Sequence, residues 1–241
     1  RDGAQSTGTM VTGVGGRTDE LTVGVVGREA PPSYVCDRVL VAVGRRPNGG
    51  VIVAEKAGVA VDEKGVIAVD AQQRTNVRHI FAIGDGVGQP MLAHKASAQG
   101  EMVAEILAGH ERQFDKVAIP AIVFTEPEIV SVGLTPDEAK ERGEEIIVGK
   151  FPLAANGRAL TLEAEKTGGF IRVTARESDH VILGVQAVGS HVAELHSEFI
   201  LALEMGALLE DIADTVHAHP TMTEAFHEAA LKTLGHAIHS S

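Results

Sequence analysis

Two histidines and a glutamate near the carboxyl end of the sequence form the pattern that most strongly suggests acid–base chemistry. His217 and His219 flank one alanine, and Glu224 follows His219 by five residues. A carboxylate that holds one imidazole nitrogen orients the ring and raises its basicity, which suits a general base near neutral pH. The pattern therefore predicts His219 as a candidate base and Glu224 as its orienting partner.

The same residues also have a purely structural interpretation. Thr221 precedes Glu224 by three positions, the spacing of a capping box at the start of a helix. A cis bond between His219 and Pro220 would fix the imidazole ring sharply. On residue types alone, the catalytic and the structural interpretations both stay open.

A second pattern follows an apolar run over residues 79–83. It reads Gly84-Asp85-Gly86-Val87-Gly88, and a helix is expected soon after it. Such strand ends bind ligands in open sheets, because the following helix offers unpaired backbone N–H groups, and a carboxylate there accepts hydrogen bonds from sugar or ribityl hydroxyls. Gln89 stands where the third glycine of G-x-G-x-x-G would fall, so a tight turn that needs glycine is the alternative.

Composition excludes several other kinds of function. The 241 residues carry a net charge of −12, which argues against a nucleic-acid partner. No run approaches the ~20 apolar residues of a membrane span, so we expect no membrane association and a cytoplasmic location. Eleven histidines come without an H-E-x-x-H motif or a cysteine pair, and we expect no metal site. Cys36 is the single cysteine, so the chain alone cannot form a two-thiol redox centre.

The elements expected to position these residues differ between the two halves. In the first half, alternating or apolar runs predict strands, and a helix is predicted from 91 to 108. The strands are expected at 9–16, 21–26, 37–44, 65–70 and 79–85. The run at 37–44 is continuous and apolar, which is typical of a buried strand in a parallel sheet.

The second half predicts an α+β module, with an antiparallel sheet and helices on one side. Strands are expected within 118–134 and 144–153, and a hairpin at 168–176 and 181–189. Helices are expected from Thr135, with Thr as N-cap, Pro next and Glu138 three residues after the cap, and over 191–205 and 222–234. The helix at 191–205 is expected to place Val192, Leu195, Phe199 and Leu203 on one stripe. Residues 1–120 hold 13 basic and 14 acidic side chains, whereas 121–241 hold 8 and 19, so the halves look like different modules.

With these segments in view, the sequence resembles the dihydrolipoamide dehydrogenases, a family of flavin disulfide reductases. The matching stretches occur in the family's order and cover about residues 35–235; they are 41–48, 75–85, 89–96, 124–128, 210–213 and 217–221. The resemblance implies an α/β plus α+β architecture in three parts. Residues 1–43 resemble the tail of an NAD-binding domain, 44–117 the returning part of an FAD-binding domain, and 118–241 the interface domain of a dimer.

The resemblance also implies roles for the first two parts. Asp85 matches the residue that binds the ribityl chain of FAD. Met91, Leu92 and Ala93 match the helix N-terminus whose backbone lies near the flavin ring. The loop near the nicotinamide nucleotide of NAD is matched by Gly44 and Arg45.

In the third part, His219 matches the general base that takes a proton from the dihydrolipoyl thiol, and Glu224 matches its orienting partner. In the family this pair serves the active site of the other subunit, so the resemblance implies a homodimer. It further implies FAD and NAD as cofactors. The implied partners are the lipoyl domains and core of a 2-oxo acid dehydrogenase complex.

Three family features are absent: the G-x-G-x-x-G for FAD, the C-x-x-x-x-C redox disulfide and the G-x-G-x-x-G for NAD. The sequence therefore resembles the C-terminal half of the enzyme, and we expect the chain alone to be inactive. The alternatives are a non-catalytic dimerisation fragment or another flavin disulfide reductase, such as glutathione or mercuric reductase. Residues 44–117 would lack much of their sheet and expose apolar strand edges.

Overall fold

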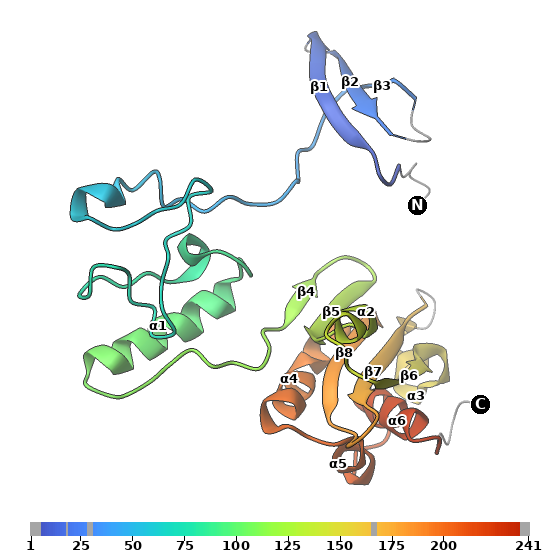
Figure 1. Ribbon diagram of the computed structural model, residues 1–241. Helices are drawn as coiled ribbons and strands as arrows, with labels where there is room; N and C mark the ends of the chain where they lie inside the picture. The colour runs from blue at the N-terminus through green and yellow to red at the C-terminus, as the bar shows by residue number, and fades with distance from the viewer. Residues whose placement is uncertain (1–5, 18, 28–30, 165–167, 237–241) are drawn as a thin grey trace. The chain divides into compact units, whose positions relative to one another are not determined.

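The computed structural model describes residues 6–17, 19–27, 31–164 and 168–236. The chain divides into two compact units, Arg1–Arg46 and Pro47–Ser241. The helices and strands of both units are labelled in Figure 1. None of the described helices is long and apolar enough to cross a membrane.

The first unit is a small antiparallel sheet. Strands β1 (Met10–Arg17), β2 (Glu20–Val26) and β3 (Ser33–Cys36) pair in that order. The alternating glycine-rich pattern thus correctly predicted β1 and β2, whereas β3 was not predicted. Among the described residues of this unit, Val25 is the one buried apolar side chain, so the sheet has little core of its own.

The apolar run at 37–44 does not form the predicted buried strand. Its residues have no regular secondary structure, and Leu40 and Val43 are 91% and 92% exposed. A parallel strand is held by hydrogen bonds to neighbouring strands on both sides. No strand of the described residues pairs with this run, so its apolar side chains lie exposed.

Residues 47–117 of the second unit, here called the loop region, contain one long helix, α1 (Ala93–Leu107), and the short 3-10 helices η1 (Ala54–Ala57) and η2 (Gly84–Val87). The strands predicted at 65–70 and 79–85 are wrong, because these segments form only isolated bridges, Val61 to Ile67 and Arg74 to Phe81. Backbone hydrogen bonds such as Ile67 N–H to Gly86 C=O hold the turns together instead.

Residues 118–236, here called the sheet domain, form the predicted antiparallel sheet. Its order is β4-β5-β8-β7-β6, and every neighbouring pair is antiparallel. The strands are β4 (Ala121–Val123), β5 (Glu128–Gly133), β6 (Ile146–Pro152), β7 (Phe170–Arg176) and β8 (Ile182–Gly189). The predicted β7–β8 hairpin is confirmed, and it turns at residues 177–181.

Helices complete the sheet domain. They are α2 (Pro136–Glu141), α3 (Gly157–Thr161), α4 (His196–Met205), α5 (Leu209–Asp214) and α6 (Glu224–Thr233), with 3-10 turns η3 (Leu153–Ala155) and η5 (Val192–Leu195). Helix α4 packs on β5 and β8, and α6 packs on β6 and β7. Thr135 caps α2 in a complete capping box with Glu138, as predicted.

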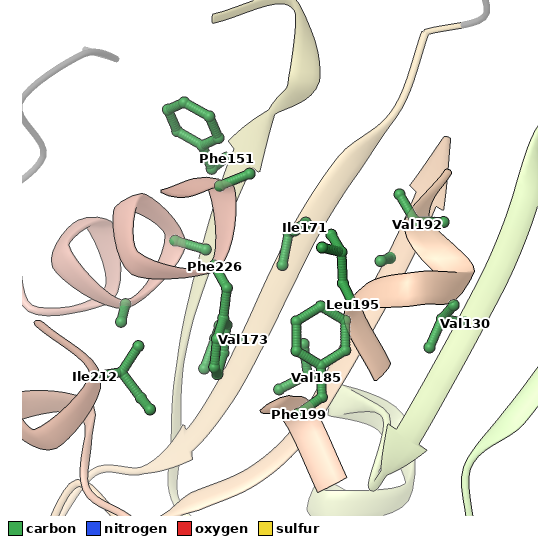
Figure 2. Close-up of a cluster of buried hydrophobic side chains, with 14 of the residues drawn as sticks. Val130, Phe151, Ile171, Val173, Val185, Val192, Leu195, Phe199, Ile212 and Phe226 are labelled. Atoms are coloured by element: carbon green, nitrogen blue, oxygen red, sulfur yellow. The ribbon is translucent and has the colours of Figure 1, made fainter. Parts of the chain in front are cut away.

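The core of the sheet domain lies between the sheet and these helices. Figure 2 shows side chains of β5, β7 and β8 meeting those of η5, α4 and α6. The predicted stripe of Val192, Leu195, Phe199 and Leu203 is buried throughout. Phe199 meets Phe226 edge to face, with 4.9 Å between ring centroids, which joins α4 to α6.

Candidate active site

The turn before α6 brings the predicted base and its partner together. The Nδ1 atom of His219 lies 2.9 Å from Oε1 of Glu224, and the His219–Pro220 peptide bond is cis. Because a carboxylate only accepts, Nδ1 carries the proton of a neutral ring and Nε2 keeps its lone pair. The ring is exposed, with 78% of the side-chain surface accessible, whereas Glu224 is only 22% exposed. The arrangement presents a basic Nε2 to whatever approaches this turn.

Glu224 is held by a second contact. Its Oε2 accepts a hydrogen bond of 2.7 Å from the backbone N–H of Thr221, which is one half of the predicted capping box. The predicted N-cap position is wrong, because Thr223 rather than Thr221 is the N-cap of α6; the Thr221 hydroxyl donates to the carbonyl of Ala218. Glu224 is therefore fixed between the backbone and the imidazole, which combines the two interpretations that the sequence left open.

A neighbouring segment also supports this turn, through a contact that the sequence did not predict. Asn156 caps α3 by accepting from the Ala159 N–H, and its Nδ2 donates to the carbonyl of Thr221 at 3.1 Å. The residue is only 3% exposed, so both contacts are sheltered from water. An Asn before a short helix signals a cap, but nothing local in the sequence indicates its reach to residue 221.

The Gly84–Gly88 segment forms the second candidate site, packed against α1. The Gly84 N–H donates to Oε1 of Gln99 at 2.8 Å, and Nζ of Lys95 donates to the carbonyl of Gly88 at 2.7 Å. Burial lowers the pKa of Lys95, an effect opposed by the nearby negative charge of Asp85. These contacts fix the loop that carries Asp85 on a buried face of the helix.

The start of α1 lies two residues later than predicted. Ala93 is the first helical residue, and Leu92 is an N-cap whose side chain makes no capping bond. Met91 precedes the helix, with its N–H bonded to the side chain of Gln89. An uncapped helix start leaves backbone N–H groups able to donate to an acceptor-rich ligand, and Asp85 lies in the loop just before it.

The remaining predicted site residues, Gly44 and Arg45, are exposed and belong to the first unit. Across the described residues, no group of three or more His, Cys, Asp or Glu side chains is arranged to hold a metal ion.

Comparison with known proteins identifies the class of protein to which the chain belongs. Residues 119–230 match the dimerisation domain of the pyridine nucleotide-disulphide oxidoreductases, and residues 5–100 match a second domain of the same class. The HOCl-induced flavoprotein disulfide reductase RclA from Escherichia coli superposes with a TM-score of 0.80 at 26% identity, over 92% of this chain and 50% of that one. The chain belongs to the pyridine nucleotide-disulphide oxidoreductases.

Within that class, the chain is homologous to dihydrolipoyl dehydrogenases. It is 56% identical to the dihydrolipoyl dehydrogenase of Pseudomonas aeruginosa over 203 residues, which are 84% of this chain and 43% of the relative. It is 44% identical to the dihydrolipoyl dehydrogenase of Bacillus subtilis over 97% of this chain and 49% of the relative. The chain thus spans less than half the length of these two relatives.

Proposed function

We propose that the chain is the C-terminal half of an FAD-dependent dihydrolipoyl dehydrogenase, which oxidises dihydrolipoyl groups with NAD⁺ as acceptor. The observation that carries this proposal is the His219–Glu224 pair. Its His219 ring is exposed, and Nε2 of that ring can act as a base. Homology to dihydrolipoyl dehydrogenases supports the choice of substrate. The redox disulfide belongs to residues outside this sequence, because Cys36 is the single cysteine.

In this proposal, Nε2 of His219 accepts the proton of the dihydrolipoyl thiol and leaves a thiolate, the form of sulfur that attacks a disulfide. The ring then carries a positive charge, which the Glu224 carboxylate at Nδ1 stabilises. The Thr221 N–H and Asn156 keep that carboxylate and its turn in place during the transfer. Glu224 therefore contributes both orientation and charge.

We place FAD at the second site. Asp85 would bind the ribityl hydroxyls, and the backbone at Met91, Leu92 and Ala93 would face the flavin ring. The fixed loop and the uncapped start of α1 fit such a ligand, since a carboxylate and backbone N–H donors lie on two elements, η2 and α1, that contact each other. Bound FAD would supply the two-electron carrier between thiols and NAD⁺.

The nucleotide of NAD would lie near Gly44 and Arg45. This position follows from the proposed division of the chain into an NAD-domain tail (1–43), the returning part of the FAD domain (44–117) and the interface domain (118–241). The family match over residues 5–100 supports the class of protein on which that division is based.

We propose a homodimer formed through residues 118–241. The match to a dimerisation domain supports it, and so do apolar side chains left on the surface of the sheet domain: Leu201, Met205 and Val216 are 60%, 75% and 95% exposed. Each His219 would then serve the partner subunit's redox site. Lipoyl domains and the core of a 2-oxo acid dehydrogenase complex would be the larger partners, in the cytoplasm.

Replacing His219 by Gln in the complete protein tests the proposal. We expect dihydrolipoamide oxidation to slow by roughly 10²–10⁴-fold, the usual contribution of a positioned base. The matched control is His236→Gln, because His236 is exposed just beyond α6. An unchanged rate in the His219 variant would remove the assignment of the base.

The same preparations separate the alternatives. We expect the 241-residue chain alone to show no turnover, and the complete protein to prefer dihydrolipoamide over glutathione or mercuric ion. Preference for either of those substrates would keep the class and change the enzyme. A complete protein with bound flavin and no thiol oxidation would favour a non-catalytic role.

A further inference from the structure

The first histidine of the pair, His217, has an environment opposite to that of His219. Its side chain is only 6% exposed, compared with 78% for His219. Its Nε2 lies 2.8 Å from Oε1 of Glu198 on α4, and its Nδ1 lies 2.9 Å from the carbonyl oxygen of Thr215. One ring thus ties the segment before His219 to a helix of the sheet domain.

Both ring nitrogens of His217 face acceptors. A ring N–H of His217 can donate to the Glu198 carboxylate or to the Thr215 carbonyl oxygen. A hydrogen bond from a ring N–H to a carboxylate is stronger than one between two neutral groups. The contact is therefore a firm anchor rather than an incidental surface pair.

A second helix completes the arrangement. The ring of His227 on α6 lies against that of His217, with 5.2 Å between centroids, and Nε2 of His227 lies 2.9 Å from the carbonyl of Ala213. Among the described residues, the titratable side chains that contact His217 are Glu198 from α4 and His227 from α6. The segment leading to His219 is thus held from both α4 and α6.

We propose that Glu198 and His217 are positioning residues that hold the His219 turn in place for proton transfer. The turn is attached on both sides of the base: His217 bonds to Glu198 before it, and after it Glu224 bonds to the Thr221 N–H and Asn156 to the Thr221 carbonyl. With one attachment removed, the His219 ring would sample orientations in which Nδ1 leaves Glu224. The expected effect on catalysis rests on the proposed function, whereas the coupling between the Glu198–His217 contact and the His219 turn does not.

Backbone amide exchange of Thr221 measures the coupling in the chain as it stands, because that N–H is bonded to Glu224. We expect exchange to become about tenfold faster or more in Glu198→Ala, while amides of β7 and β8 stay unchanged. Glu198→Gln can donate to Nε2 of a neutral His217, so it should restore exchange to within about twofold of the wild type. Glu194→Ala, an exposed glutamate one turn earlier, is the matched control.

Unchanged Thr221 exchange in Glu198→Ala would overturn the inference, and so would faster exchange that Glu198→Gln fails to restore. Equal acceleration of Thr221 and the β7–β8 amides would mean general destabilisation, which also contradicts it. Should Glu198→Ala not fold, Glu198→Asp decides, since it keeps the charge but withdraws the carboxylate by one carbon.

A second measurement concerns catalysis in the complete protein. Glu198→Ala should lower kcat for dihydrolipoamide with little change in KM, and Glu198→Gln should recover most of it. If His219→Gln proves harmless, the proposed function fails while the exchange result can still hold. If His219→Gln is severe but both Glu198 variants match the wild type in kcat, the positioning role is wrong.

Discussion

Two segments that the sequence predicts as strands differ in burial. Residues 39–43 are all aliphatic, whereas strand β7 alternates apolar with polar side chains. In β7, Ile171 and Val173 are fully buried, whereas Leu40 and Val43 are more than nine-tenths exposed. The difference lies in neighbours: β7 pairs with β6 and β8, but no strand among the described residues pairs with 39–43.

The loop region also leaves apolar side chains exposed, unlike the sheet domain. Val51 and Ile52 are 78% and 63% exposed, and a cavity of about 410 Å³ opens nearby, lined by apolar residues that include Val59, Ile67 and Phe81. Folded interiors rarely leave apolar volume of this size unfilled. The sheet domain holds its own packing partners, whereas we propose that residues 39–86 pack against parts of the complete protein outside this sequence.

The largest expected effect distinguishes a buried apolar side chain of the sheet domain from an exposed one in residues 39–43. Phe226→Ala should lower the free energy of unfolding of the sheet domain by about 3–5 kcal/mol, because it leaves a cavity beside Phe199. Leu40→Ala, with the side chain 91% exposed, should change it by less than about 0.5 kcal/mol. Denaturant unfolding of the chain, followed by β7 and β8 amide signals, measures both. Similar losses in the two variants would break the comparison.

A smaller effect is expected at a helix start. Thr135→Ala removes the complete capping box of α2 and should cost about 1 kcal/mol in the same assay. Ser97→Ala on α1 removes only an exposed hydroxyl that bonds back to the Ala93 carbonyl, so we expect about 0.5 kcal/mol at most. A loss at Ser97 equal to that at Thr135 would show that α1 is as strongly coupled to the sheet domain as α2.

The smallest effect depends on pH. The hydrogen bond from His180 holds the pKa of Glu210 below its usual value. A carboxyl whose folded pKa is depressed stabilises the fold above its unfolded pKa, near 4.3, and loses that contribution as pH falls through the folded value. Glu210→Gln should therefore cost less than about 1 kcal/mol at neutral pH, since both partners are over a third exposed, and should converge with the wild type in acid.

The control for that titration is Glu101→Gln on α1, an exposed glutamate of the loop region. We expect unfolding profiles of this variant and the wild type to run parallel from neutral pH into acid. A pH-independent gap between wild type and Glu210→Gln would show that the His180 contact stabilises through packing rather than charge.

The sequence predicted best where signals are local or partners lie within the chain. The capping box at Thr135, the β7–β8 hairpin and the stripe of Val192, Leu195 and Phe199 all rest on short spacings, and all are confirmed. The predicted strand at 37–44 is wrong because apolar patterning indicates a strand but not whether its neighbours are present.

Prediction at the candidate site follows the same division. Contact between His219 and Glu224 could be expected because five residues and a helix start separate them. Contacts of Asn156 with Thr221 and of Glu198 with His217 cross 65 and 19 positions, and no local spacing indicates them. The distinction between a buried His217 and an exposed His219 also depends on the tertiary fold rather than on the nearly symmetric sequence around them.

Amide hydrogen exchange of the isolated chain and of the complete protein separates the two regions most sharply. We expect the same protection in β5 to β8 in both samples, and protection of residues 39–53 by at least about a hundredfold only in the complete protein. Strong protection of 39–53 in the isolated chain, or rapid exchange of β5 to β8 without the remainder of the enzyme, would contradict this expectation.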